Sequence, residues 1–139
     1  MTGSHSRSAR DVVEELSRGH GEADESVLDD LVATDMVKHA ADPQGRDGLR
    51  TILRTIKGDL GPTELEQHHV ISEGDLVVQH VTPHGTHRAS TMPLLTDVPV
   101  AGRSAAWTFI HIWRVADGML VEHWAHLDDM GPLEQLRPS

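Results

Sequence analysis

The stretch that decides the fold is Ala105-Ala-Trp-Thr-Phe-Ile-His-Ile-Trp-Arg-Val115, followed by the turn Asp117-Gly118 and the return run Met119-Leu-Val-Glu-His-Trp-Ala-His-Leu127. Two apolar runs joined by an Asp-Gly turn are typical of a β-hairpin. The return run carries imidazoles and carboxylates into a segment that is otherwise built to be buried. Because buried ionisable groups are costly unless they are paired or used, this hairpin suggests acid/base chemistry on a bound small molecule.

The size and charge of the chain limit what it can be. Its 139 residues are enough for one compact domain but not for two. Its formal charge of -10, from 22 Asp and Glu against 12 Lys and Arg, argues against binding to nucleic acid or to an acidic membrane surface. Cysteine is absent, so any metal would be held by His and carboxylates. No apolar stretch approaches the length of a membrane span, and we expect a soluble cytoplasmic protein.

Three helices are predicted in the first part of the chain. Apolar residues recur at helical spacing over Arg10–Arg18, Asp24–Val32 and Gly45–Gly58, which is typical of amphipathic helices. The segment Met36–Ala40, between the second and third helices, is predicted to be short and extended.

Strands follow these helices. From Thr63–Ile71 the apolar pattern alternates, and Leu76–His87 resumes it after a Ser-Glu-Gly-Asp turn, which predicts a hairpin. Pro83 and Gly85 predict a bend or bulge in the second strand, and Met92–Gly102 is predicted to be an irregular loop. Helices followed by about four antiparallel strands favour an α+β domain, with helices packed on one curved sheet.

Several short motifs resemble one family. In chain order they are Asp75-Leu-Val-Val78, Gly85-Thr-His87, Val100-Ala-Gly-Arg103, His111-Ile-Trp-Arg-Val-Ala-Asp-Gly118, Val121-Glu-His-Trp124, Asp128 and Gln135-Leu136. Their order and spacing resemble the SnoaL-like polyketide cyclases of the nuclear-transport-factor-two-like superfamily. The resemblance implies a cone-shaped single α+β domain over residues 10–136. In this fold about three N-terminal helices pack on a curved, mainly antiparallel sheet that encloses a pocket; residues 1–9 form a flexible N-terminal segment.

The same resemblance implies cofactor-free ring closure of the aldol type. An acid/base pair on the last two strands would move the protons, and the family's strand histidine corresponds to His111. The family's catalytic aspartate aligns with Ala125, which cannot carry a proton. Either His123, His126 or Asp128 takes over that role, or the protein performs different chemistry in the same cavity.

Strand alternation leaves two possible faces for the pocket. His111 shares a face with Trp107, Phe109 and Trp113, and His123 shares one with Val121, Ala125 and Leu127. If the pocket lies on the His123 face, His111 and His123 are the candidate base and acid. If it lies on the opposite face, with Glu122 and Trp124, the candidates are His126 and Asp128, the carboxylate orienting the imidazole. A bulge near Trp124 would mix the two sets.

Each candidate has a structural alternative. His111 and His123 could be core histidines, and Asp128 could cap the tail from Asp129 to Leu136. His39 could be a solvated strand end, and a hydrogen bond could explain His87. The catalytic candidates are His111, His123 and Asp128; the substrate-binding candidates are His39, His87, Trp107, Phe109, Trp113 and His126. No metal site is predicted, because the histidine spacings show no zinc signature.

Three classes of function remain open. The first is a polyketide cyclase that acts on a polyketide-like small molecule without a cofactor. The second is a hydrolase, isomerase, hydroxylase or epoxide-opening enzyme with the same pocket. The third is a non-catalytic binding or assembly module. A homodimer or higher homo-oligomer is expected in every case, because the apolar positions on both faces of Ala105–Val115 need cover.

Overall fold

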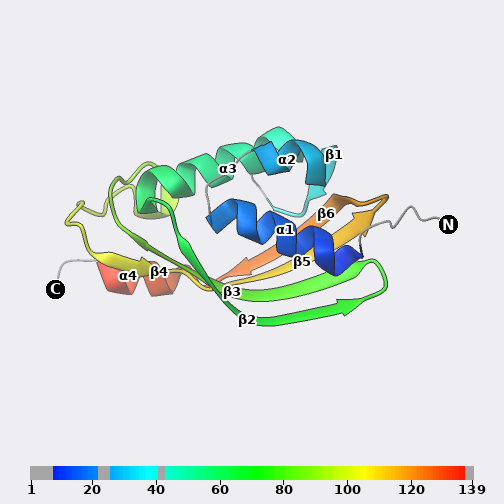
Figure 1. Ribbon diagram of the computed structural model, residues 1–139. Coiled ribbons are helices and arrows are strands. Elements are labelled where there is room, and N and C mark those ends of the chain that lie inside the picture. The colour runs from blue at the N-terminus through cyan, green and yellow to red at the C-terminus, as the bar shows by residue number, and fades with distance from the viewer. Residues whose placement is uncertain (1–7, 22–25, 41–42, 137–139) are drawn as a thin grey trace.

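Helices and strands follow one another in the predicted order (Figure 1). A computed structural model of the protein describes residues 8–21, 26–40 and 43–136. The expected flexible segment 1–9 therefore lies largely outside the described residues. The elements are α1 (Ala9–Gly21), α2 (Ser26–Leu31), β1 (Val32–Lys38), α3 (Gly45–Leu60), β2 (Glu64–Glu73), β3 (Leu76–Thr86), the 3₁₀ turn η1 (Pro93–Leu95), β4 (Ser104–Ala106), β5 (Phe109–Ala116), β6 (Met119–Leu127) and α4 (Met130–Leu136).

The strands form one curved, mixed sheet. Within the described ranges it has six strands in the order β1-β6-β5-β3-β2, with β4 paired to the far end of β3. The pairings are antiparallel except that β1 runs parallel to β6. Parallel pairing needs a long connection, and here the chain from α3 to β5 supplies it.

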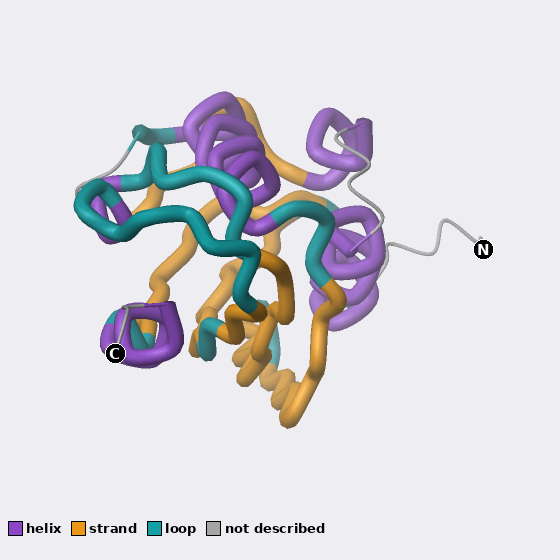
Figure 2. The backbone as a smooth tube through the Cα atoms, turned by 90° about the vertical axis from the view of Figure 1, so that its left-hand side faces the viewer, coloured by secondary structure: helices purple, strands orange, loops and turns teal. Residues whose placement is uncertain are grey.

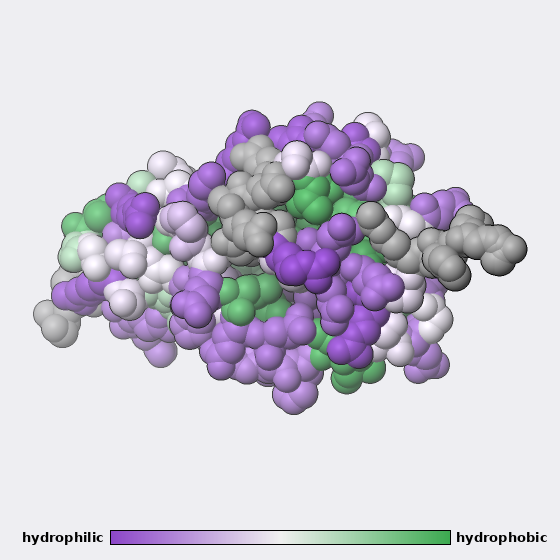
Figure 3. Space-filling model, viewed as in Figure 1, coloured by the Kyte–Doolittle hydropathy of each residue, from purple (hydrophilic) through white to green (hydrophobic). Residues whose placement is uncertain are grey.

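The helices α1, α2 and α3 lie over one face of this sheet, which we call the inner face (Figures 1 and 2). α1 places Val12, Val13 and Leu16 on Val77 and Trp113, and these residues form a first apolar cluster with α2, β1 and β6. A second cluster gathers the end of α3, the segment 92–98, Trp107, Phe109 and α4. The side of the molecule in Figure 3 is mainly hydrophilic, as expected where α1 and α3 turn their polar faces outward.

The predicted helices are confirmed, with one correction at their borders. α2 ends at Leu31 rather than Val32, because Val32 already pairs with Leu120 of β6. The extended segment predicted at Met36–Ala40 is consequently longer and begins at Val32. The predicted start of the second helix, Asp24, lies outside the described residues. No helix in the described part of the chain is long and apolar enough to cross a membrane.

The run Ala105–Val115 is not one strand, which corrects the count of about four strands. β4 pairs with β3 through Ala106 and His84, whereas β5 pairs with β3 through Phe109 and Val81. The chain between them leaves the ladder, and the backbone N–H of Trp107 donates to Pro83 O at 3.2 Å. The hairpin of β5 and β6 itself is as predicted.

The bulge predicted near Pro83 and Gly85 lies in the partner strand instead. The register of β2 and β3 shifts between Gln67 and His69, so β2 carries the extra residue. Gly85 has a different use, because a Cβ atom there would come within 2.5 Å of the carbonyl oxygen of Leu60. The missing side chain allows the end of α3 to approach β3.

Candidate functional site

The inner face of the β5/β6 hairpin holds two imidazoles in contact. His111 Nδ1 and His123 Nε2 lie 2.8 Å apart, which is hydrogen-bond distance. In the strand register His111 lies opposite Ala125, and His123 lies opposite Trp113. The two imidazoles therefore meet diagonally, and because Ala125 carries only a methyl group, His123 can reach His111 across that position.

The two histidines have different environments. His123 is only 6% exposed, and burial, with smaller contributions from Lys38 and His39, lowers its pKa from 6.5 to about 3. Desolvation disfavours the charged form of a buried imidazole, so His123 is neutral near pH 7. His111 is only half-buried. His111 is therefore the member of the pair that a bound molecule can reach.

When both imidazoles are neutral, the hydrogen bond between them couples their protons. If His111 Nδ1 donates to His123, then His111 Nε2 carries a lone pair and can accept a proton. If His123 Nε2 donates instead, His111 Nε2 carries the hydrogen and can donate it. The same ring atom can therefore act as base or as acid, according to the direction of the hydrogen bond.

Aromatic rings line the inner face beside the pair. Successive centroids from Trp107 to Phe109, from Phe109 to His111 and from His111 to Trp113 lie 5.0, 5.2 and 5.3 Å apart. Trp113 also stacks on His123, with centroids 4.0 Å apart and planes 25° apart. Alternation predicted this shared face, although β4 and β5 are separate strands. The rings give the pair a flat, apolar border.

A bulge in the hairpin corrects one predicted set of neighbours. The register of β5 and β6 shifts between Arg114 and Val115 rather than at Trp124. As a result, Leu120 and His123 are both buried although they are three residues apart. The bulge therefore breaks the alternation that was expected to join Val121 to the His123 face.

The indole N–H of Trp107 is a buried donor. Its Nε1 atom is the one buried side-chain nitrogen or oxygen without a hydrogen-bond partner in the described part of the chain. Leaving such a donor unpaired costs about 1–3 kcal/mol. A ligand oxygen or a water molecule in the second apolar cluster would remove that cost.

His39 and His126 lie on the opposite, outer face of the sheet. His39 Nε2 is 2.6 Å from Glu122 Oε2, and its ring stacks on Trp124 at 4.7 Å. The hydrogen bond with His39, and next the one from Arg114, lowers the pKa of Glu122. His126 is exposed and lies opposite Ile110. The structure thus does not bring these two candidates to the imidazole pair.

Asp128 and His87 both have structural partners. Asp128 Oδ1 accepts a hydrogen bond from the backbone N–H of Gly131 at 3.2 Å, as a cap of α4 would. His87 is almost fully buried, and its Nε2 lies 2.8 Å from Ser90 Oγ. The Ser90 hydroxyl donates to Val98 O at 2.7 Å, so His87 is the donor to serine. A catalytic role for Asp128 and a binding role for His87 stay predictions.

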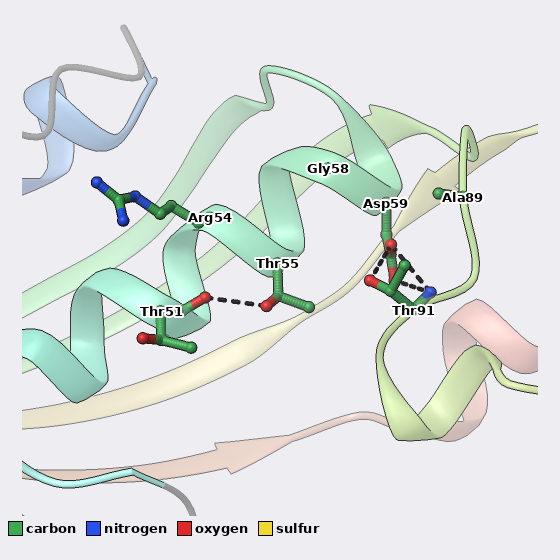
Figure 4. A pocket seen from close by; sticks show the side chains of 7 residues that line it. All are labelled: Thr51, Arg54, Thr55, Gly58, Asp59, Ala89 and Thr91. Carbon is green, nitrogen blue, oxygen red and sulfur yellow. Dashed lines mark hydrogen bonds between the residues drawn. The ribbon is translucent and has the colours of Figure 1, made fainter.

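A surface pocket of about 430 Å³ lies elsewhere, lined by α3 and by the segment after β3 that carries Ala89 and Thr91 (Figure 4). At its end, fully buried Asp59 accepts hydrogen bonds from Thr91 N, Thr91 Oγ1 and Met92 N. These bonds satisfy Asp59 and hold the segment after β3 against α3. Its lining residues are Thr51, Arg54, Thr55, Gly58, Asp59, Ala89 and Thr91.

Asp59, Gln79 and Lys38 are among the buried polar residues that the sequence did not single out. Asp59 lies in the last turn of α3, where the helix dipole disfavours a carboxylate. Its position could therefore have indicated from the sequence that Asp59 has hydrogen-bond partners outside the helix. Gln79 interrupts the inner-face positions Val77 and Val81 of β3, and Lys38 is paired with His123 in the register of β1 and β6. Among the described residues, no three His, Asp or Glu side chains converge as a metal site requires.

The sequence profile of the SnoaL-like polyketide cyclases matches residues 10–136. The chain belongs to this family. No curated protein matches the chain. Family membership and the curved α+β sheet under its helices agree with the expectation drawn from the motifs.

Solved structures share the fold of this SnoaL-like protein. IdmH from Streptomyces antibioticus, described as a candidate polyketide cyclase, has 28% sequence identity and a TM-score of 0.79, and the match covers 94% of this chain and 99% of that chain. TsrD from Streptomyces laurentii has 23% identity and a TM-score of 0.80, with 98% of each chain covered. AclR from Streptomyces galilaeus, described as a candidate hydroxylase, has 21% identity and a TM-score of 0.80, covering 94% and 87%. The last two matches concern the fold alone.

Proposed function

We propose that this SnoaL-like protein is a cofactor-independent cyclase that closes a ring on a small polyketide-like substrate by acid/base catalysis. The observation that carries the proposal is the hydrogen-bonded pair of His111 and His123 on the inner face. The pair lies between the two apolar clusters, with Trp113 in the first and Phe109 in the second. A reachable imidazole in an apolar setting is suited to proton transfer near neutral pH.

In the proposed reaction His111 Nε2 removes a proton from a carbon next to a substrate carbonyl. The resulting enolate carbon attacks a second carbonyl carbon of the same molecule, and a carbon–carbon bond forms. His111 Nε2 then returns the proton to the oxygen of that second carbonyl, which becomes a hydroxyl. Protons and electrons balance without a cofactor.

His123 supports this cycle by remaining neutral. It accepts the hydrogen bond from His111 Nδ1 and so holds the tautomer in which His111 Nε2 carries the lone pair that acts as the base. Because the pKa of His123 is lowered to about 3, the positive charge formed during the cycle stays on His111. The protonated His111 can then donate its proton to the product oxygen.

Trp107 and Phe109 would hold the substrate. Both rings belong to the second apolar cluster and continue the row of rings that passes through His111. The unpaired indole N–H of Trp107 is a suitable donor for a substrate carbonyl oxygen. A flat molecule with carbonyl groups fits both features.

A second candidate is an isomerase, hydrolase, hydroxylase or epoxide-opening enzyme that uses the same pair. It is favoured by one observation, the methyl group of Ala125 directly opposite His111. The resemblance implies a carboxylate at that position in the cyclases. Enolate formation is common to the cyclase and to an isomerase, so the first experiment addresses that step.

The test is deuterium exchange at the carbon next to the carbonyl of 2-tetralone, followed by NMR in D₂O. We expect the protein to accelerate exchange over buffer, and His111→Ala to lose about 10²- to 10⁴-fold of that acceleration, the usual contribution of a general base. His69→Ala, which removes an exposed imidazole of β2, is the matched control and should retain the rate. An unchanged rate in His111→Ala would overturn the proposal, and no acceleration by the wild type would favour a binding module.

A further inference from the structure

A buried amide joins α1 to the ring that covers His123. Gln79 of β3 is only 3% exposed, and it lies directly opposite His111 in the register of β3 and β5. Trp113 Nε1 donates to Gln79 Oε1 at 2.9 Å, and Gln79 Nε2 donates to Ser17 Oγ at 2.8 Å. The amide therefore bridges the helix layer and the sheet beside the imidazole pair.

Each hydrogen bond in the series from Trp113 through Gln79 and Ser17 to Val13 has one possible direction. An indole N–H can only donate, so the oxygen of Gln79 must face Trp113 and its nitrogen must face Ser17. The Ser17 hydroxyl in turn donates to the backbone oxygen of Val13 at 3.0 Å. This series of hydrogen bonds ends on the backbone of α1, so the Gln79 amide cannot flip without leaving buried groups unpaired.

This series of hydrogen bonds determines where the Trp113 ring lies. The indole is 3% exposed and stacks on His123 with its centroid 4.0 Å from that of the imidazole. It also borders His111 at 5.3 Å. A ring held in this place excludes water from His123, and water is what an imidazolium would need.

We propose that Gln79 is a positioning residue: by fixing the Trp113 indole against His123, it confines the proton that the site takes up to His111. The inference rests on the proposed function for the role of His111. In this role Gln79 acts on His123 through the Trp113 indole.

Other groups also act on His123 and would remain in a Gln79 variant. Lys38 and His39 of β1 both disfavour its protonation, and His111 of β5 is its hydrogen-bond partner. Gln79 also has a long contact of 3.4 Å from its Nε2 to Gln67 Oε1. Gln67 is exposed, so Gln67→Leu removes a neighbour of the amide and leaves the bond to Trp113.

The experiment follows the ring nitrogens of each histidine by NMR in the full-length protein from about pH 8 down to about pH 3. In the wild type and in Gln67→Leu, His123 should begin to protonate only at the acid end of this range, because burial lowers its pKa to about 3. In Gln79→Met and in Trp113→Phe, its proton affinity should rise at least about tenfold, which is one pKa unit. The double variant should show the same shift as either single variant, because both remove one hydrogen bond.

The inference is overturned if His123 titrates identically in the wild type and in either folded single variant, or if Gln67→Leu shifts it as much. Should Gln79→Met fail to fold, Trp113→Phe decides, because it keeps an aromatic ring and lacks only the indole donor and its second ring. The test needs no substrate. If the pKa of His123 rises in the Gln79 variant while His111→Ala exchanges deuterium as fast as the wild type, the positioning role of Gln79 is supported and the proposed function is overturned.

Discussion

The imidazole of His123 is buried where protonation opposes folding. In the unfolded chain its pKa takes the ordinary value of 6.5, whereas in the folded protein burial lowers it to about 3. Between these values the unfolded state binds the proton and the folded state does not. Stability from this residue is therefore fully present above the unfolded pKa of 6.5 and is lost as pH falls from there toward 3.

Replacing His123 should flatten this part of the acid response. For one such histidine we expect the free energy of unfolding to fall by about 2 kcal/mol between pH 7 and pH 5. His123→Gln should lack this component, which urea unfolding at the two pH values would measure. His69→Gln, at an exposed imidazole, is the control and should keep the wild-type response. An equal fall in His123→Gln and the wild type would show that His123 is not held neutral.

At the residue scale the sequence predicted the shared face of Trp107, Phe109, His111 and Trp113, because alternation on a strand is local. It left open whether His123 joined that face. Whether His123 meets His111 depends on the bulge between Arg114 and Val115 and on the diagonal contact of the two imidazoles beside Ala125. Both are properties of two paired strands and not of one strand alone. Gln79 was missed because only the packed structure shows which indole its amide bonds.

At the scale of elements, the approach of α3 to β3 depends on one glycine. A Cβ atom at Gly85 would lie 2.5 Å from Leu60 O and 3.0 Å from Leu60 Cβ, which forces the end of α3 away from the strand. Gly85→Ala should destabilise the protein by about 1–3 kcal/mol, as overpacking usually does. Thermal or urea unfolding measures the loss.

Gly58 is the matched control within α3. A Cβ atom there meets nothing within 4 Å, and alanine is a better helix former than glycine, so Gly58→Ala should stabilise the protein by up to about 1 kcal/mol. A neutral Gly85→Ala would contradict the close approach of α3 and β3, and a destabilising Gly58→Ala would contradict the open space beside Gly58. The length of the helix was predictable from its apolar spacing, but this contact between α3 and β3 was not.

At the scale of the whole molecule, the outer face of the sheet presents apolar side chains. Val37 is 49%, Ile71 62% and Ile110 42% exposed. Apolar residues gathered on one sheet face favour burial in an interface. The expectation of a homodimer was drawn from the β5 sequence, and the structure describes a single copy, so self-association stays a prediction.

That prediction can be tested with one substitution and one control. Ile110→Asp should weaken the dimer, because it places a charge at the centre of the face, and sedimentation equilibrium would report the change in dissociation constant. Val100→Asp makes the same change at a residue that is 50% exposed in the loop before β4, and it should leave association unchanged. A wild-type protein that is monomeric at all concentrations would contradict the prediction.

Family and fold class were within reach of the sequence, because the motifs and the order of helices and strands are properties of the chain itself. The parallel pairing of β1 with β6, and the division of β4 from β5, were not, because they depend on partners far apart in the chain. The candidate residues of the site were named from sequence. The strand pairing was needed to separate them. It shows that His111 and His123 meet on the inner face, that His39 and His126 lie on the outer face, and that Asp128 and His87 have structural partners.

Chemical rescue of His111→Ala is the most direct measurement of the role assigned to His111. Removing the half-buried imidazole should leave a space beside His123 that free imidazole can enter from solvent. We predict that added imidazole restores deuterium exchange on 2-tetralone to this variant well above its effect on the wild type. If exchange in His111→Ala already equals that of the wild type, or if imidazole stimulates both proteins alike, His111 does not carry the proton.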